Sequence, residues 1–110
     1  LNRKNNLNKK LNVFKTGSEV LIIDEKTIDY NKNIAEQTLE YLKSKDIYSV
    51  IVEGGAQTLN TFLKENLWDE IKVFKSQKKL VSGTNAPIIQ SIKFSEKKIV
   101  NDRLITYCNN

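Results

Sequence analysis

The sequence predicts an α/β fold with three layers, in which a mixed, mostly parallel sheet lies between flanking helices and ends in an antiparallel hairpin. Two short apolar runs, at 19–24 and 47–52, each precede a segment with helical periodicity. A strand, helix, strand, helix order is typical of right-handed crossovers between parallel strands. The end of the chain instead alternates apolar and polar residues, which is typical of antiparallel strands.

The first strand and the first helix are predicted from residues 19–44. The run Glu19–Asp24 has a continuous apolar centre, as in a strand that is buried on both faces. Asn33, with Glu36 three residues later, resembles a capping box, in which two side chains satisfy amides at a helix N-terminus. Apolar residues then recur at helical spacing. We therefore expect a central strand at 19–24 and an amphipathic helix over 34–44.

A second strand and a second helix are predicted from residues 47–67. The segment Ile47–Val52 is rich in β-branched and apolar residues, which favours a strand. After a glycine pair, apolar residues at helical spacing predict a helix; they are Leu59, Phe62, Leu63 and Leu67.

The remaining third of the chain predicts the antiparallel part of the sheet. Ile71–Phe74 suits a third strand, and Gly83–Pro87 suits a loop. We interpret Asn101-Asp102 as a turn between strands at 98–100 and 104–107. This hairpin makes the predicted sheet mixed.

Composition predicts one modest domain over residues 1–110, because 39% of the residues are apolar. The chain begins at Leu1 and holds no Met, so we expect a piece of a longer protein. The net charge of +5 arises in residues 1–18, which hold five bases and no acid: Arg3, Lys4, Lys9, Lys10 and Lys15. This basic segment is either a solvated, partly mobile arm or a polyanion contact.

Several classes of function are excluded by the residues that are missing. No apolar run approaches the roughly 18 residues that a membrane span needs, and the N-terminus does not resemble a signal peptide, so we expect a cytoplasmic protein. The chain has no His and only Cys108, which excludes a disulfide within the chain, a zinc site and a Ser-His or Cys-His nucleophile. No metal site is predicted. Hydride transfer remains open, because there the cofactor supplies the reactive group.

The motif Val50-Ile51-Val52-Glu53-Gly54-Gly55-Ala56-Gln57 is the main candidate site. Glycine after a buried strand permits a sharp turn and close approaches that a Cβ would block. Unpaired amides of the first helical turn, from Gly55 to Thr58, would attract an anion such as a phosphate. Close packing of helix on strand is an alternative reason for the glycines, and the full dinucleotide fingerprint Gly-x-Gly-x-x-Gly is absent.

Glu53 is the candidate substrate contact. A carboxylate at the carboxyl end of a buried strand faces the crevice in which ligands of α/β sheets bind. It can accept hydrogen bonds from hydroxyl or amino groups of a substrate. Alternatively, it caps backbone amides of its own turn.

The chain resembles the C-terminal reductase domain of the bifunctional riboflavin-biosynthesis deaminase–reductase, which has a dihydrofolate reductase-like fold. The likeness covers most of the chain, from Leu1-Asn2-Arg3 to the terminal hairpin. It depends on four stretches: Ile51-Val52-Glu53-Gly54-Gly55-Ala56-Gln57-Thr58-Leu59, then Phe62-Leu63, then Leu67-Trp68-Asp69-Glu70-Ile71, and later Gly83 with Ala86-Pro87.

The resemblance implies an NADPH-dependent reduction of 5-amino-6-(5-phosphoribosylamino)uracil to its ribitylamino form. By position, Glu53 corresponds to the acid that contacts the substrate, and the charge of Arg3 suits the adenosine 2′-phosphate of the cofactor. The stretch that corresponds to the wrap around the NADPH phosphates is Gly54, Gly55, Ala56, Gln57, Thr58, Leu59, Asn60 and Thr61.

The chain also departs from the family pattern. Asn2 stands where the family usually has Asp, and the loop around Lys78-Lys79 lacks a Pro that is often found there. The first half of the family's domain is absent, so we expect a truncated domain that is inactive as an isolated chain. An incomplete sheet exposes apolar surface and an unpaired edge, which predicts that the chain forms a homo-oligomer through the sheet or pairs with another chain. The alternative is a non-catalytic basic module that binds polyanions or forms an oligomer interface; binding to nucleic acid is not expected.

Overall fold

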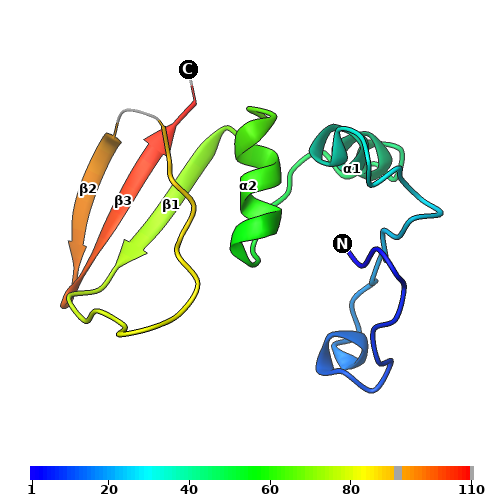
Figure 1. Ribbon diagram of the computed structural model, residues 1–110, viewed down its shortest axis with the longest axis horizontal. Coiled ribbons are helices and arrows are strands. Elements are labelled where there is room, and N and C mark those ends of the chain that lie inside the picture. The colour runs from blue at the N-terminus through cyan, green and yellow to red at the C-terminus, as the bar shows by residue number, and fades with distance from the viewer. Residues whose placement is uncertain (91–92, 110) are drawn as a thin grey trace. The chain divides into compact units, whose positions relative to one another are not determined.

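The chain forms two units in the computed structural model, Leu1–Val50 and Ile51–Asn110 (Figure 1). The structure describes residues 1–90 and 93–109. Helices make up the regular structure of the first unit, and the second unit combines one helix with a small sheet. The fold is therefore α/β, as predicted. Each unit is described by itself.

The N-terminal unit contains a short 3-10 helix, η1 (Asn12–Lys15), and the helix α1 (Ile34–Lys43). The predicted helix over 34–44 is thus confirmed. The expected capping pair forms, since Asn33 Nδ2 donates to Glu36 Oε2 at 2.8 Å. Asn33, the N-cap residue, makes no side-chain cap hydrogen bond to α1. The expected pair therefore forms between the two side chains.

The strand expected at Glu19–Asp24 is not regular in the structure, so that prediction is wrong. Two backbone hydrogen bonds join it to the start of the chain, Asn2 N to Ile23 O at 2.9 Å and Glu25 N to Arg3 O at 3.1 Å. A strand needs a neighbour along its whole length, and this contact is too short to supply one. The segment still contributes Ile23 to the buried side chains of this unit, which also include Ile28 and Ala35.

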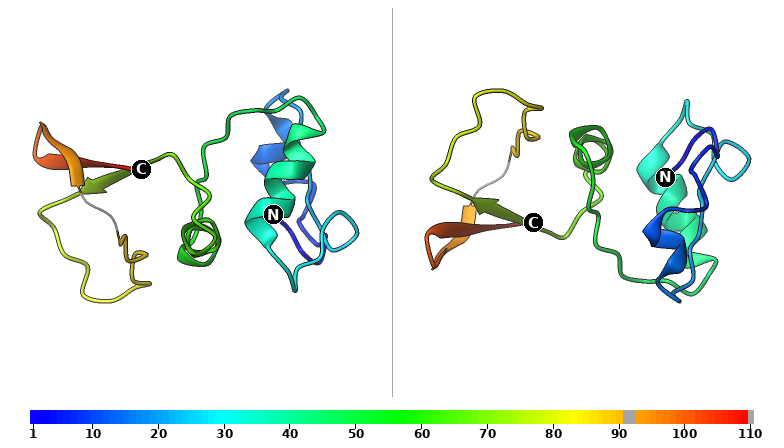
Figure 2. Two further views of the ribbon diagram at one scale, coloured as in Figure 1. Left: turned by 90° about the horizontal axis from the view of Figure 1, so that it is seen from above. Right: turned by 90° about the horizontal axis from the view of Figure 1, so that it is seen from below.

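The C-terminal unit contains α2 (Ala56–Lys64) and three strands, β1 (Glu70–Lys75), β2 (Lys93–Ile99) and β3 (Asp102–Cys108). The strand order is β1-β3-β2, and both pairs are antiparallel. Figure 2 shows the sheet from two further sides, with the loop 76–90 leaving it. The second helix, the third strand and the hairpin are confirmed.

The prediction of a mostly parallel sheet is wrong. It required residues 19–24 and 47–52 to lie in the sheet, and neither segment is among its strands. Val50 and Ile51 are exposed, and Ile51 retains 88% of its accessible surface. An apolar, β-branched run favours a strand only where a neighbouring strand can pair with it.

The β2–β3 hairpin turns one residue earlier than predicted. Ile99 pairs with Asp102, so Val100 and Asn101 form the turn. Val100 has a φ of 53°, a left-handed conformation that is unusual for a β-branched residue. A positive φ at the first central residue of a two-residue hairpin turn normally selects glycine.

Both α-helices end in a Schellman motif. At the end of α2, Leu67 N donates to Phe62 O and Asn66 N donates to Leu63 O, with Asn66 left-handed at a φ of 53°. At the end of α1, Ile47 N donates to Leu42 O and Asp46 is left-handed at a φ of 59°. The motif satisfies carbonyl groups that a helix end leaves unpaired.

Asn109 ties the end of β3 to the loop after α2. Its backbone amide donates to Asp69 O at 2.9 Å, and its side-chain amide donates to Trp68 O at 2.8 Å and to Asn66 Oδ1 at 3.1 Å. These bonds fix the connection between α2 and β1. The position of α2, and so of the candidate site at its N-terminus, depends on this connection.

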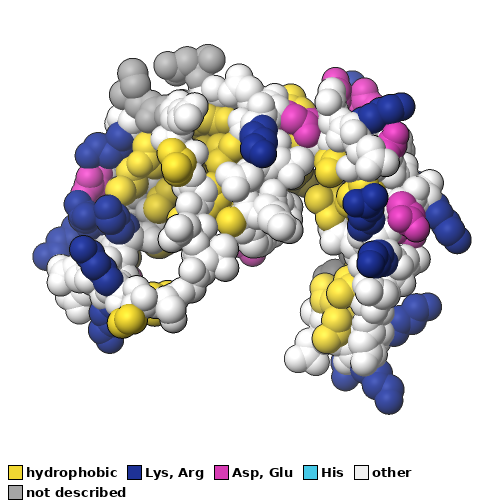
Figure 3. Space-filling view, in the orientation of Figure 1, with side chains coloured by type: hydrophobic (Ala, Val, Ile, Leu, Met, Phe, Trp, Pro, Cys, Tyr) yellow, Lys and Arg dark blue, Asp and Glu magenta, His cyan; other side chains and the backbone are white. Residues whose placement is uncertain are grey.

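Apolar side chains remain exposed on the sheet of the C-terminal unit (Figure 3). Phe74 of β1 retains 67% of its accessible surface and Phe94 of β2 retains 74%.

Within the described residues, no helix is both long enough and apolar enough to cross a membrane.

Candidate functional site

The N-terminus of α2 presents unpaired amides. Gly55 is the N-cap residue, with φ −66° and ψ 163°, and as a glycine it has no side chain with which to cap the helix. Leu59 N donates to Gly55 O at 3.3 Å, whereas the amides of Ala56, Gln57 and Thr58 have no acceptor among the described residues. These three donors lie at the positive end of the helix dipole, where an anion is stabilised.

The local backbone does not require glycine at position 54 or 55. The sharp turn that the sequence predicted is therefore not the reason for these two glycines. Neither Gly54 nor Gly55 has a positive φ. A Cβ added to Gly54 would make ordinary contact with Thr58, 3.5 Å from its Cβ, and a Cβ added to Gly55 would meet nothing within 4 Å. Glycine therefore leaves open space in front of the unpaired amides.

Glu53 precedes this turn and is exposed. Its carboxylate makes no hydrogen bond or ion pair with the described residues, and no side chain caps α2. The contacts therefore give no support to the alternative that Glu53 caps its own turn.

The other predicted cofactor residues belong to the second turn of α2. Leu59, Asn60 and Thr61 are half-buried. The hydroxyl of Thr61 donates to Gln57 O of its own helix at 3.0 Å. The structure thus brings the amides of residues 56–58 together as donors, and Leu59–Thr61 lie behind them.

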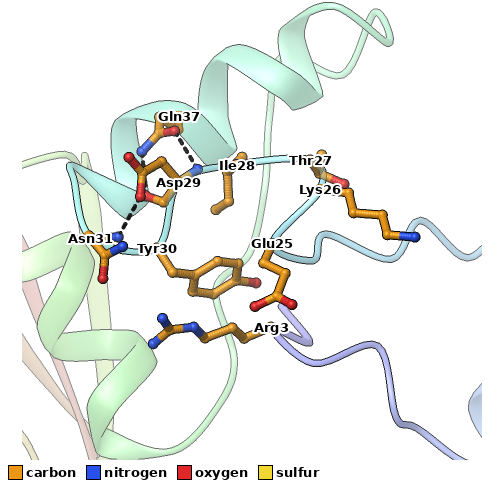
Figure 4. A pocket seen from close by; sticks show the side chains of 9 residues that line it. All are labelled: Arg3, Glu25, Lys26, Thr27, Ile28, Asp29, Tyr30, Asn31 and Gln37. Atoms are coloured by element: carbon orange, nitrogen blue, oxygen red, sulfur yellow. Dashed lines mark hydrogen bonds between the residues drawn. The ribbon is translucent and has the colours of Figure 1, made fainter.

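Arg3 lies in the N-terminal unit, where it borders an open pocket of about 490 Å³ (Figure 4). Its guanidinium carbon is 5.6 Å from the centre of the Tyr30 ring. The pocket is lined by Arg3, Glu25, Lys26, Thr27, Ile28, Asp29, Tyr30, Asn31 and Gln37. Sequence reasoning missed this pocket, because Arg3, Tyr30 and Gln37 line it from separate segments of the chain.

Hydrogen bonds hold the polar loop that forms this pocket. Hydrogen bonds from the Lys26 amide and from Thr27 lower the pKa of Asp24. A hydrogen bond from the Asn31 amide, together with the charge of Lys32, lowers the pKa of Asp29. The Tyr30 hydroxyl donates to Ile23 O at 2.6 Å, and burial raises its pKa. The loop is therefore ordered by its own polar groups.

The chain is thus an α/β protein in which a Glu-Gly-Gly turn leads into a helix whose first amides have no acceptor among the described residues. Residues 1–107 match the family described as the RibD C-terminal domain. The chain belongs to this family. No solved structure matches the chain.

One relative is the Riboflavin biosynthesis protein RibD of Aquifex aeolicus (strain VF5). The two sequences are 36% identical over 91 residues, which cover 77% of this chain and 24% of that protein. The chain therefore matches about a quarter of the length of this curated relative.

Proposed function

We propose that this chain forms the cofactor-binding part of an NADPH-dependent reductase of riboflavin biosynthesis. The reaction is the reduction of 5-amino-6-(5-phosphoribosylamino)uracil to its ribitylamino form. The observation that carries the proposal is the set of three unpaired amides at the start of α2, in a chain of the RibD C-terminal family. The dihydrofolate reductase-like fold is part of the same proposal.

The residues at the start of α2 fit a dinucleotide phosphate. The amides of Ala56, Gln57 and Thr58 supply donors and the helix dipole supplies positive potential. The open space at Gly55 lets phosphate oxygens approach the backbone closely. When bound, NADPH supplies the hydride that reduces the ribosyl group. The protein contributes binding and orientation.

Two further residues have roles in this proposal. Glu53 orients the substrate, because its unpaired carboxylate can accept hydrogen bonds from substrate hydroxyl or amino groups. Arg3 binds the adenosine 2′-phosphate, because a guanidinium donates two parallel hydrogen bonds to phosphate oxygens. The isolated chain is proposed to bind the cofactor without turnover, as a cytoplasmic homo-oligomer.

The test is a titration of the chain with NADPH, followed by amide chemical shifts. We expect the amides of Gly54, Gly55 and Thr58 to shift saturably, because they border the proposed phosphate site. Amides at the far end of the same helix, such as that of Lys64, serve as the internal control. Unchanged shifts at Gly54 and Gly55 with saturating NADPH would contradict the site.

A further inference from the structure

Three basic side chains lie in one row across the end of the sheet. In the register of the strands, Arg103 of β3 lies opposite Lys75 of β1 on one side and opposite Lys98 of β2 on the other. Residues directly opposite one another share a face of an antiparallel sheet, and neighbouring strands are only about 4.8 Å apart. Like charges in such pairs repel each other, so this cation row costs stability.

The nearby acid leaves part of this charge unneutralised. Glu96 is shared between Lys93, at 2.7 Å, and Arg103, at 3.0 Å, and hydrogen bonds from both lower its pKa. Among the residues that the structure describes, Lys75 and Lys98 form no ion pair. Figure 3 shows Lys and Arg side chains gathered on the side of the sheet at which β2 lies. The cation row therefore has positive charge available for an anionic partner.

The strand β2 adds a backbone edge to this charge. In the part of the chain that the structure describes, β2 pairs with β3 alone, and every residue of Lys93–Ile99 is exposed. Its pairing is regular from Ser95 to Ile99, beyond the register shift between Lys93 and Ser95. Within this stretch Lys97 and Lys98 project to opposite faces of the sheet. The outer amide and carbonyl groups of such an edge can pair with an added strand.

The charge of this edge decides which strand can pair with it. The β2 edge of a second copy would bring more lysines against Lys97 and Lys98, and like charges on neighbouring strands are destabilising. A strand with two adjacent acids presents one carboxylate to each face, which matches the two lysines. An acid beside Lys98 also offsets the repulsion between Lys98 and Arg103. The same residues therefore exclude one partner and favour another.

We propose that the free edge of β2 binds an extended, acidic segment of a partner protein. The segment adds a strand beside Ser95–Ile99, with its carboxylates next to Lys97 and Lys98. The cation row contributes positive potential on one face of the extended sheet. The inference is independent of the proposed reductase function, because none of these residues belongs to the candidate site at α2.

The test compares two short peptides that bind to the whole chain. One is a blocked peptide of alternating Thr and Val with two adjacent Glu at its centre, and the other has Gln in place of Glu. We expect the Glu peptide to bind about tenfold more tightly, and its affinity to fall as salt is added. Its binding should slow hydrogen exchange of amides within Ser95–Ile99. Equal affinities, or slowed exchange confined to other parts of the chain, would overturn the proposal.

A second probe, oligothymidylate, separates an acidic strand from a general polyanion. It carries negative charge along its backbone but cannot add a strand to a sheet. We expect it to bind more weakly than the Glu peptide and to leave hydrogen exchange within Ser95–Ile99 unchanged. If it bound as tightly at the same residues, the surface would be a nucleic-acid or general polyanion site and the proposal would be refuted.

Substitution of the two lysines separates binding from stability. Lys97→Gln with Lys98→Gln should weaken the Glu peptide about tenfold and leave the Gln peptide unchanged. The same pair should raise the urea midpoint, because it removes the repulsion between Lys98 and Arg103. Lys64→Gln is the matched control, since it removes an exposed cation from the last turn of α2, outside the sheet, and should leave both peptides unchanged. If the lysine pair lowered the urea midpoint and weakened both peptides equally, the lysines would be structural only and the proposal would fail.

Discussion

Asp24 illustrates how single residues order the N-terminal unit. Its side chain is buried, and one carboxylate oxygen accepts from Lys26 N at 3.0 Å and from Thr27 Oγ1 at 3.1 Å. These bonds stabilise the charged form, so folding lowers the pKa of Asp24 below its ordinary value of 3.8. The stabilisation is complete above that value and is lost as the pH falls through the folded-state pKa.

Substitution of Asp24 should therefore change how the fold responds to acid. At neutral pH we expect the urea midpoint to fall in the order wild type, Asp24→Asn, Asp24→Ala, since the Asn oxygen can accept the same two hydrogen bonds without charge. The wild type should also lose stability below about pH 4, and Asp24→Asn should lose less. Identical acid sensitivity in both proteins would show that Asp24 is not responsible for the loss of stability at low pH.

At the residue level, sequence reasoning located a candidate turn but not its surroundings. The Glu53-Gly54-Gly55 motif could be read because glycine and acid after an apolar run form a local pattern. The pocket at Tyr30 could not be predicted from the sequence, because it depends on Arg3 and Gln37, which are far from each other in the chain. Contacts between distant segments leave no periodic signal.

At the level of elements, helices were predicted better than strands. The periodicity around Leu39 and Phe62 located α1 and α2 because a helix satisfies its own backbone. The runs 19–24 and 47–52 have strand composition, but strands form only with partners. The hairpin was predicted because its two strands are adjacent, and its turn was misplaced by one residue because Val100 is an unusual residue for a positive φ.

The strained turn at Val100 gives a prediction about the hairpin. Val100→Gly should stabilise the C-terminal unit by about 0.5–1 kcal/mol, because glycine removes the steric penalty of a left-handed β-branched residue. Glycine also has more conformational freedom in the unfolded chain, which offsets part of this stabilisation. Asn101→Gly is the control, since Asn101 has no positive φ, and it should not stabilise. Thermal unfolding followed by β3 amides measures both. Equal effects of the two variants would mean that the turn is not strained at Val100.

The Asn109 contacts predict how the end of β3 supports α2. Asn109→Asp keeps the shape of the side chain but removes the donor to Trp68 O and Asn66 Oδ1, which should cost about 1–2 kcal/mol. Asn85→Asp in the exposed loop 76–90 is the matched control and should be close to neutral. Chemical denaturation monitored by Trp68 fluorescence compares the two variants. A neutral Asn109→Asp would show that these bonds do not hold the connection.

For the molecule as a whole, we expect exposed apolar side chains to determine the oligomeric state in solution. Phe74 and Phe94 are largely exposed on the strands, and further apolar side chains are exposed in the loop 76–90. Exposed apolar patches of this kind mark interaction surfaces. The edge strand β2 carries Lys93, Lys97 and Lys98, which disfavours pairing along its edge. We therefore expect association through the apolar side chains and not through β2 backbone hydrogen bonds.

Self-association should accordingly depend on the sheet. Sedimentation velocity should show the average mass rising with protein concentration, and Phe74→Thr with Phe94→Thr should reduce this rise while keeping strand propensity. The control is Leu7→Thr with Val13→Thr, which removes similarly apolar, exposed side chains from the N-terminal unit. A folded monomer at all concentrations, or an equal effect of the two pairs, would count against a sheet-mediated oligomer.

The proposed binding of NADPH phosphates by amides at the start of α2 can be tested by substituting Ala56. The NADPH dissociation constant of Ala56→Pro is compared with that of Ala56→Ser. Proline at the first helical position removes one amide donor and is tolerated there, and Gly55 already has the extended backbone that a following proline requires. We expect Ala56→Pro to bind NADPH about tenfold more weakly, with α2 intact, and Ala56→Ser to bind like the wild type. Equal NADPH affinity of the two variants would contradict the proposed phosphate site at the start of α2.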